Sequence, residues 1–187
     1  VEAGVTIIEI VPKLDAGPML GKASLKIEAT ETTGELERRL AELAIPLTER
    51  VVDEIEEGKS KPEIQDEAAV IHVRKLAKTD GQIPWSKPAI EVERHIRGMQ
   101  PWPGPFCHLH QTDKPPLRLQ VLSAKPVGVP TVMDAAGTVI AVDTNDMTVR
   151  CGEGAISIQT LQPDGKRPMA VSDFLRGRKV SKGDRLE

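Results

Sequence analysis

Two apolar runs near the start of the chain predict two strands joined by a tight turn. The run "GVTIIEIV" (residues 4–11) is rich in β-branched residues and predicts a buried strand. The run "MLGKASLKI" (residues 19–27) alternates apolar and polar positions, which is typical of a second strand. The stretch between them contains Asp15, Gly17 and Pro18, which are residue types that favour turns.

Apolar side chains at three- and four-residue spacing then predict one long amphipathic helix. The stretch "TTGELERRLAELAIPLTERVVDEIEEG" (residues 32–58) keeps these side chains on one face. We expect Thr32 or Thr33 as the N-cap, because a hydroxyl can accept a hydrogen bond from the first turn, and Gly58 as the stop. The apolar positions are Leu36, Leu40, Leu43, Leu47, Val51 and Ile55.

The second half of the chain changes from helical to strand-like spacing. Residues 59–69 are polar and start a linker, and residues 85–99 predict a second helix capped by Ser86. Beyond Phe106, short apolar runs alternate with Gly, Pro, Asn and Asp, which favours a small antiparallel barrel. A helical turn capped by Ser172 follows it. The predicted strands include residues 117–124, 137–143, 147–151 and 154–161.

These elements predict an α+β, multidomain fold. The first domain covers residues 1–60, a linker covers residues 61–79, and the C-terminal domain covers residues 80–187. The chain starts at Val1 rather than Met, so we interpret it as a piece of a longer protein.

Composition narrows the class of protein. Charged residues make up 28% and hydrophobic residues 39%, which is ordinary for a globular chain and excludes a disordered class. No apolar run approaches the roughly 20 residues of a membrane span, and no basic and apolar leader precedes the first strand, so we expect a cytoplasmic protein without a membrane partner. Cys107 and Cys151 lack metal-ligand spacing, which favours two free thiols.

The net charge of −3 is unevenly distributed along the chain. Residues 1–79 carry a net charge of −5, residues 80–187 carry +2, and residues 166–185 alone carry +5. Such a basic segment either contacts phosphates or forms a solvated surface, and the sequence supports the two about equally. Because only 2% of the residues are aromatic, phosphate recognition is favoured over base stacking. The candidates are Lys166, Arg167, Arg176, Arg178, Lys179, Lys182 and Arg185.

Four other residues are candidates for chemistry or binding. Asp15 is either a catalytic carboxylate or a plain turn residue, and turn chemistry alone favours the plain turn. Trp102 in "QPWPGPF" either stacks on a ligand or forms a rigid apolar corner that enters the barrel, and its flanking prolines favour the corner. His108 and His110 share one face of a strand, but no third ligand is evident, so we expect no metal.

Three segments together resemble the methionyl-tRNA formyltransferase family. They are "GVTIIEIVPKLDAGPML" (residues 4–20), "WSKPAIEVERHIRGMQPWPGPF" (residues 85–106) and "LQPDGKRPMAVSDFLRGRKVSKGDRL" (residues 161–186). The resemblance runs from the end of the family's catalytic domain through its C-terminal domain. It implies that residues 1–60 are a remnant of an α/β formyltransferase domain and that residues 80–187 form an OB-like barrel that helps to hold tRNA.

The same resemblance implies an activity. A monomeric enzyme of translation initiation would transfer a formyl group from 10-formyltetrahydrofolate to the amino group of methionine on initiator tRNA, without a metal. Asp15 aligns with the family's catalytic aspartate, and the seven basic residues are candidates for tRNA contact. The family's catalytic Asn and His and its folate-binding loop lie upstream of this chain, so we expect no turnover from residues 1–187 alone.

Two alternatives remain open. One is a folate-dependent formyltransferase that acts on an amino sugar or a nucleotide sugar, because such enzymes share the Asp-x-Gly turn and a similar barrel. The other is a module that only binds tRNA. The ending "LQPDGKRPMAVSDFLRG" favours the tRNA enzyme.

Overall fold

In the computed structural model, which describes residues 1–128 and 134–187, the chain divides into two units with separate sheets. The first unit is Val1–Lys75 and the second is Leu76–Glu187. The first sheet has two strands and the second has seven.

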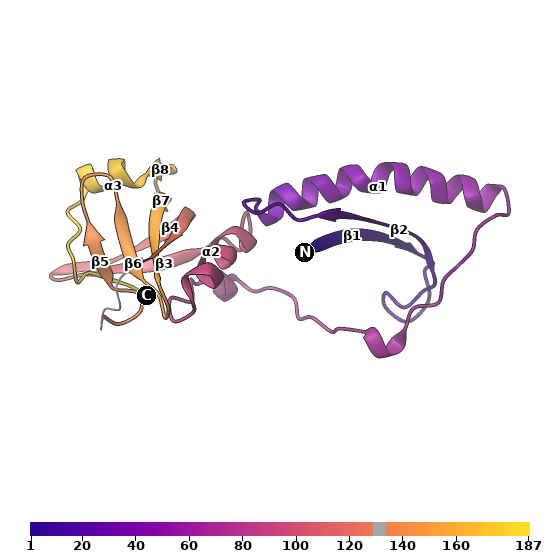
Figure 1. Ribbon diagram of the computed structural model, residues 1–187, viewed down its shortest axis with the longest axis horizontal. Helices are drawn as coiled ribbons and strands as arrows, with labels where there is room; N and C mark the ends of the chain where they lie inside the picture. The colour runs from indigo at the N-terminus through magenta and orange to yellow at the C-terminus, as the bar shows by residue number, and fades with distance from the viewer. Residues whose placement is uncertain (129–133) are drawn as a thin grey trace. The chain divides into compact units, whose positions relative to one another are not determined.

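The first unit is a β-hairpin covered on one face by a long helix (Figure 1). Strand β1 (Glu2–Ile8) pairs antiparallel with β2 (Met19–Lys26), and α1 (Thr33–Glu56) packs on both. Leu47 and Val51 on α1 are 4% and 2% exposed. A Cβ at Gly21 on β2 would lie 2.7 Å from Val51 Cγ2, so the glycine lets the helix approach the strand closely.

Helix α1 begins where the sequence predicts it, whereas β1 is not buried as predicted. Thr32 is the N-cap: its side chain accepts a hydrogen bond from Glu35 N, and the Glu35 carboxylate accepts one from Thr32 N at 2.8 Å. These bonds hold the pKa of Glu35 below its usual range.

The prediction of a buried first strand is wrong, because every residue of β1 is exposed or half-buried: α1 covers only one face of the hairpin.

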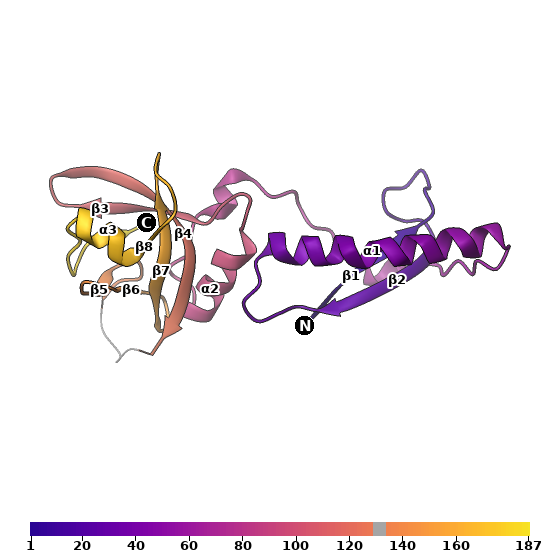
Figure 2. The ribbon, with the colours of Figure 1, turned by 90° about the horizontal axis from the view of Figure 1, so that it is seen from above.

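The second unit is an antiparallel barrel (Figure 2), as the spacing of apolar runs predicts. Its sheet has the order β5-β6-β7-β4-β3-β9. Strand β8 lies outside this order and pairs with β7 at Thr160 and Leu161. The strands are β3 (Phe106–Gln111), β4 (Lys114–Val127), β5 (Val139–Val142), β6 (Met147–Arg150), β7 (Ala155–Pro163), β8 (Met169–Ala170) and β9 (Arg185–Leu186).

Hydrogen bonds between the two ends of this sheet nearly close the barrel. Val139 N donates to Asp184 O at 2.8 Å, and Leu186 N donates to Gly137 O at 2.7 Å. Strand β9 therefore has β3 on one side and the start of β5 on the other. A Cβ at Gly137, whose φ is +85°, would lie 2.3 Å from Leu186 O, so this close approach requires glycine.

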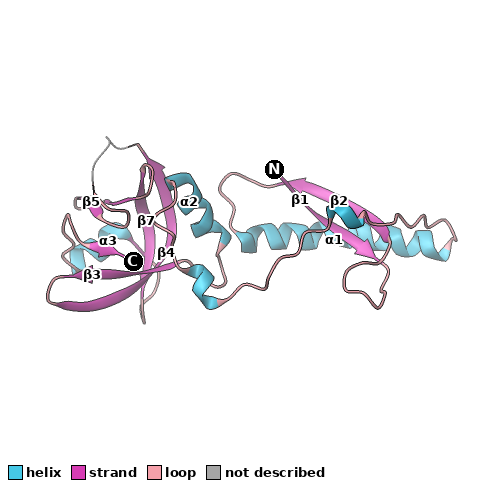
Figure 3. Cartoon of the chain, turned by 90° about the horizontal axis from the view of Figure 1, so that it is seen from below, coloured by secondary structure: helices cyan, strands magenta, loops and turns pink. Residues whose placement is uncertain are grey.

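Helices α2 and α3 and one 3₁₀ turn belong to the second unit, and another 3₁₀ turn lies in the first unit. Helix α2 (Ala89–Gly98) packs against β4 and β7 (Figure 3), and α3 (Val171–Gly177) packs against β7 and β8. The 3₁₀ turns are η1 (Glu67–Ala69), in the first unit, and η2 (Lys78–Gly81). The residues of the barrel core that are at most 1% exposed include Val92, Ile96, Leu109, Leu119, Val121, Val139, Ile156, Ile158 and Leu161.

Both serine caps predicted in this unit are wrong. Pro88 is the N-cap of α2, and the first amide of the helix, Ala89 N, donates to Glu153 O at 2.8 Å, so a carbonyl distant in sequence replaces the cap. Helix α3 begins two residues earlier than a Ser172 cap predicts: Ala170 is its N-cap, Val171 is its first residue, and Ser172 lies inside its first turn. The Val171 side chain is buried in the core.

Replacing Gly137 with Ala is expected to destabilise the barrel. The new methyl group would collide with Leu186 O, and the positive φ alone costs about 1–3 kcal/mol for a residue with a Cβ. The free energy of unfolding, measured by urea denaturation, should fall by at least that amount. The control is Gly98→Ala at the end of α2, where a Cβ meets nothing within 4 Å. Equal stability of the two variants would contradict this account of barrel closure.

Candidate functional site

Asp15 lies in the exposed loop that joins β1 to β2. Its φ is 51°, in the left-handed region, and the loop is closed by Glu9 N, which donates to Pro18 O at 3.0 Å. A Cβ at Gly17 would lie 1.8 Å from Glu9 O, so only glycine fits at that position. The Asp15 carboxylate accepts no hydrogen bond from any residue that the structure describes. It is therefore open to take up a proton or to orient an amine from outside the loop.

A side chain from the polar segment after α1 fastens this loop. Gln65 Nε2 donates to Asp15 O at 2.8 Å and to Gly17 O at 2.7 Å. The backbones of Met19 and Glu63 exchange two hydrogen bonds of 2.8 and 2.9 Å beside them. Residues 63–65 thus help to position Asp15. The sequence gives no local signal of this contact, because a glutamine in a polar stretch is normally solvated.

The seven basic residues come from three places in the barrel unit. Lys166 and Arg167 lie in the loop between β7 and β8, four others lie in or after α3, and Arg185 lies on β9. Three of the seven have side-chain partners: Arg176 pairs with Asp173, Arg178 Nε donates to Gln111 Oε1 at 2.9 Å, and Arg185 contacts Thr138 and Glu187. Lys166, Arg167, Lys179 and Lys182 are exposed, without a side-chain partner in the described part of the chain. Of the seven candidates, these four are therefore exposed and without a paired charge.

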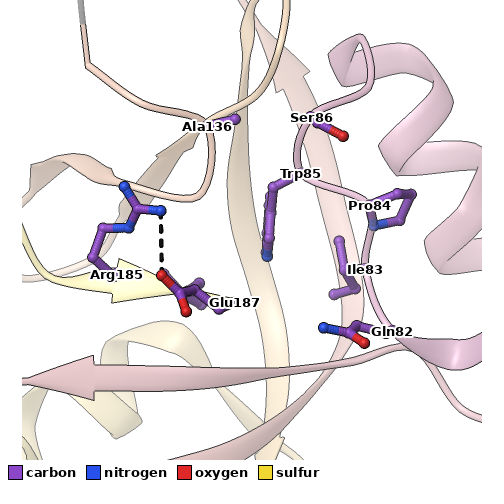
Figure 4. A pocket seen from close by; sticks show the side chains of 9 residues that line it. Gln82, Ile83, Pro84, Trp85, Ser86, Ala136, Arg185 and Glu187 are labelled. Carbon is purple, nitrogen blue, oxygen red and sulfur yellow. Dashed lines mark hydrogen bonds and ion pairs between the residues drawn. The ribbon is translucent and has the colours of Figure 1, made fainter. Parts of the chain in front are cut away.

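Arg185 lines an open pocket of about 420 Å³ in the barrel unit (Figure 4). Residues 82–86 form one wall, and Arg185 and Glu187 lie across from Trp85. The Arg185 guanidinium donates to Glu187 Oε1 at 3.3 Å and to Thr138 Oγ1 at 3.5 Å, so its charge is paired. Trp85 is only 5% exposed, so its side chain is part of the packed core of the barrel unit. Arg185 and Leu186, which line this pocket, belong to the strand whose hydrogen bonds close the barrel.

The two cysteines are buried, and His108 and His110 lie on strand β3. Cys107 and Cys151 are buried free thiols, as predicted, and burial raises the pKa of each to about 12, so neither is a nucleophile near neutral pH. No group of three metal-ligating side chains occurs among residues 1–128 and 134–187, and His108 and His110 stay without a third ligand there. Within the same ranges, no helix has the length and apolarity needed to span a membrane.

Comparison with known proteins decides the family. Residues 75–179, more than half of the chain, match the family described as "Formyl transferase, C-terminal domain". The chain belongs to this family. The resemblance found in the three sequence segments is therefore confirmed, and the antiparallel barrel is the fold of the family's C-terminal domain in this chain.

Similar proteins extend the match to the hairpin unit. The methionyl-tRNA formyltransferase of Rhodopirellula baltica is 34% identical over 99% of this chain and 57% of its own length. That of Pseudoalteromonas translucida is 38% identical over 95% of this chain and 54% of its own length. The chain thus spans about half the length of the curated relatives it matches.

Two solved structures share the fold of this chain at low sequence identity. HypX from Aquifex aeolicus, in complex with tetrahydrofolic acid, matches with a TM-score of 0.65 and 17% identity over 97% of this chain and 34% of its own. An N-formyltransferase from Helicobacter canadensis matches with a TM-score of 0.60 and 14% identity over 84% of this chain and 55% of its own. Both likenesses extend beyond the barrel of the formyl transferase C-terminal domain.

Replacing Gln65 with Ala is expected to loosen the Asp15 loop, because two hydrogen bonds to its carbonyls are lost. Limited trypsin digestion should then cut after the exposed Lys13 several-fold faster. Asp15→Asn is the matched control: Gln65 binds the backbone carbonyl of residue 15, so this variant should be cut at the original rate. Equal cutting rates for all three proteins would show that Gln65 does not hold the loop.

Proposed function

We propose that this chain is part of a methionyl-tRNA formyltransferase, an enzyme of translation initiation. It would take part in the transfer of a formyl group from 10-formyltetrahydrofolate to the amino group of methionine on initiator tRNA. The observation that carries the proposal is the 34–38% identity to proteins of that name over nearly the whole chain. The protein would act as a monomer in the cytoplasm, where initiator tRNA is formylated.

In this proposal the hairpin unit is the last part of an α/β catalytic domain, and the barrel is OB-like. The likeness of nearly the whole chain to HypX, whose structure holds tetrahydrofolic acid, supports a folate-type donor. The main donor site and the catalytic Asn and His would be supplied by residues outside 1–187, so the chain alone would not turn over.

Asp15 would manage the protons of the reaction. The methionine amine attacks the formyl carbon, a tetrahedral centre carrying negative charge forms, and the bond from that carbon to the folate nitrogen breaks. The amine loses a proton as its new C–N bond forms, and the folate nitrogen gains one as it leaves. An exposed carboxylate with no other hydrogen bond to break suits acceptance of the first proton or orientation of the amine.

Asp15→Asn in the complete polypeptide should lower formyl transfer to Met-tRNA by about 10²–10⁴-fold, because the amide cannot take up a proton. The backbone of the loop should be unchanged, since Asn also tolerates a left-handed φ. Asp113→Asn is a close control: Asp113 is likewise exposed, with a φ of 59°, in the β3–β4 turn. Comparable activity of Asp15→Asn and Asp113→Asn would refute the catalytic assignment.

A formyltransferase acting on a sugar nucleotide is the second candidate. The Helicobacter canadensis N-formyltransferase, described in complex with folinic acid and dTDP-3-aminofucose, supports it through its fold alone, at 14% identity. Assays of the complete polypeptide with Met-tRNA and with an amino-sugar nucleotide separate the two candidates.

The barrel would hold initiator tRNA through the four free cations, Lys166, Arg167, Lys179 and Lys182. Replacing all four with Gln should weaken tRNA binding and reduce the slope of log affinity against log salt by about three, since each phosphate contact contributes about 0.7–0.9. The charge-neutral control removes the ion pair of α3, as Asp173→Asn with Arg176→Gln. An unchanged salt slope in the fourfold variant would contradict tRNA contact through these side chains.

A further inference from the structure

Trp102 lines a second pocket of the barrel unit, of about 420 Å³. Trp102 is 50% exposed, so its side chain is not part of the buried core of the barrel. The pocket combines two aromatic side chains and a proline with two cationic side chains that lie far apart in the sequence. The lining residues are Lys78, Thr79, Trp102, Pro103, Phe106 and Arg118.

Backbone contacts hold the four segments of this pocket in place. A Cβ at Gly81 would lie 2.2 Å from Gly104 O, so η2 lies directly against the turn that carries Trp102. Ile83 N donates to Phe106 O at 2.9 Å, and Val121 N donates to Pro105 O at 3.0 Å. Lys78 and Trp102 are therefore carried by backbone fastened to β3 and β4, and binding there needs little ordering of the chain.

The side chains combine aromatic and cationic chemistry. The Arg118 guanidinium lies 4.4 Å above the centre of the Phe106 ring, and His108 meets the edge of that ring at 5.8 Å between centres. Lys78 is exposed, and the nearest acidic residue on its own turn, Asp80, accepts a hydrogen bond from Ala77 N. The pocket thus brings a half-exposed tryptophan together with an exposed lysine and with an arginine that lies over a phenylalanine ring.

The β7–β8 loop, which carries Lys166 and Arg167, is attached to β4 at Arg118. Asp164 N, at the start of the β7–β8 loop, donates to Arg118 O at 3.0 Å, and Gln162 pairs with Gln120 across the sheet. The loop that begins there carries Lys166 and Arg167, and Gln162 Nε2 donates to Lys166 O at 2.9 Å. The Asp164 carboxylate lies in the same loop and offsets part of this charge.

We propose that the pocket binds an unpaired nucleotide of RNA, with its base stacked on Trp102 and its phosphates near Lys78 and Arg118. Every base has a face that can stack on an indole, and cations beside such a ring follow the phosphate backbone. The site would therefore tolerate different bases. This inference rests on the proposed tRNA partner and adds a position at which a single-stranded part of that RNA is held.

Tryptophan fluorescence tests the proposal directly, because Trp85 is 5% exposed and Trp102 is the other tryptophan. The whole chain is titrated with a single-stranded RNA octamer at low salt. We expect quenching in the original chain and loss of the quenching signal in Trp102→Phe. Trp102→Ala should bind about 5- to 100-fold more weakly, and Lys78→Gln should reduce the salt slope by about one.

Ile90→Ala is the matched control, since Ile90 on α2 is 47% exposed and lies outside the pocket; its affinity should not change. Thermal unfolding of Trp102→Ala should resemble that of Ile90→Ala. Equal affinity of the folded Trp102→Ala and the original chain, equal quenching by an RNA duplex, or no RNA binding at all would each overturn the proposal. The formyl-transfer assay of Asp15→Asn does not depend on this outcome, so failure of the nucleotide site and failure of the proposed function are distinguishable.

Discussion

The closing contact of the barrel is the constraint on which the second unit depends. Strand β9 is only two residues long, yet it bonds to β3 on one side and to residues 137–139 on the other. Without it, β3 and β5 would both be open edges, and the buried side chains of Val139 and Leu186 would meet water. The contact exists because Gly137 has no side chain at the point where the two backbones meet. The same closure brings Arg185 and Glu187 across from Trp85 in the pocket of Figure 4.

Elements specified by neighbouring residues could be predicted from the sequence. The apolar spacing of α1 and its N-cap, Thr32, depend on residues in or next to the helix. The strands of the barrel are visible in the sequence as short apolar runs between turn residues. Burial of β1 and the cap of α2 could not be predicted, because they depend on residues distant in sequence. A helix covers one face of β1 and leaves the other open, and Glu153 O takes the place of a serine cap.

The sites divide in the same way. The turn around Asp15 is visible in the residue types Asp, Gly and Pro, whereas its fastening by Gln65 spans 50 residues. Trp102 is conspicuous in the sequence, but the exposure of its ring and the approach of Lys78 and Arg118 result from three further segments meeting it. A basic segment likewise predicts charge without showing that Arg176, Arg178 and Arg185 are held by neighbouring side chains.

The two-stranded sheet of the first unit differs in kind from the barrel. Each of its strands has one strand neighbour among the described residues, whereas β4 and β7 are bonded on both sides. Local opening of the hairpin therefore breaks fewer hydrogen bonds and exposes less buried surface than opening of the barrel, so the hairpin lies at the low end of the molecule's range of local stabilities. Asp15 stands at the tip of that softer element. The candidate carboxylate thus lies in the unit with fewer strand pairings, where the contacts of Gln65 hold its loop, whereas the four exposed candidate cations lie in the unit with the larger sheet.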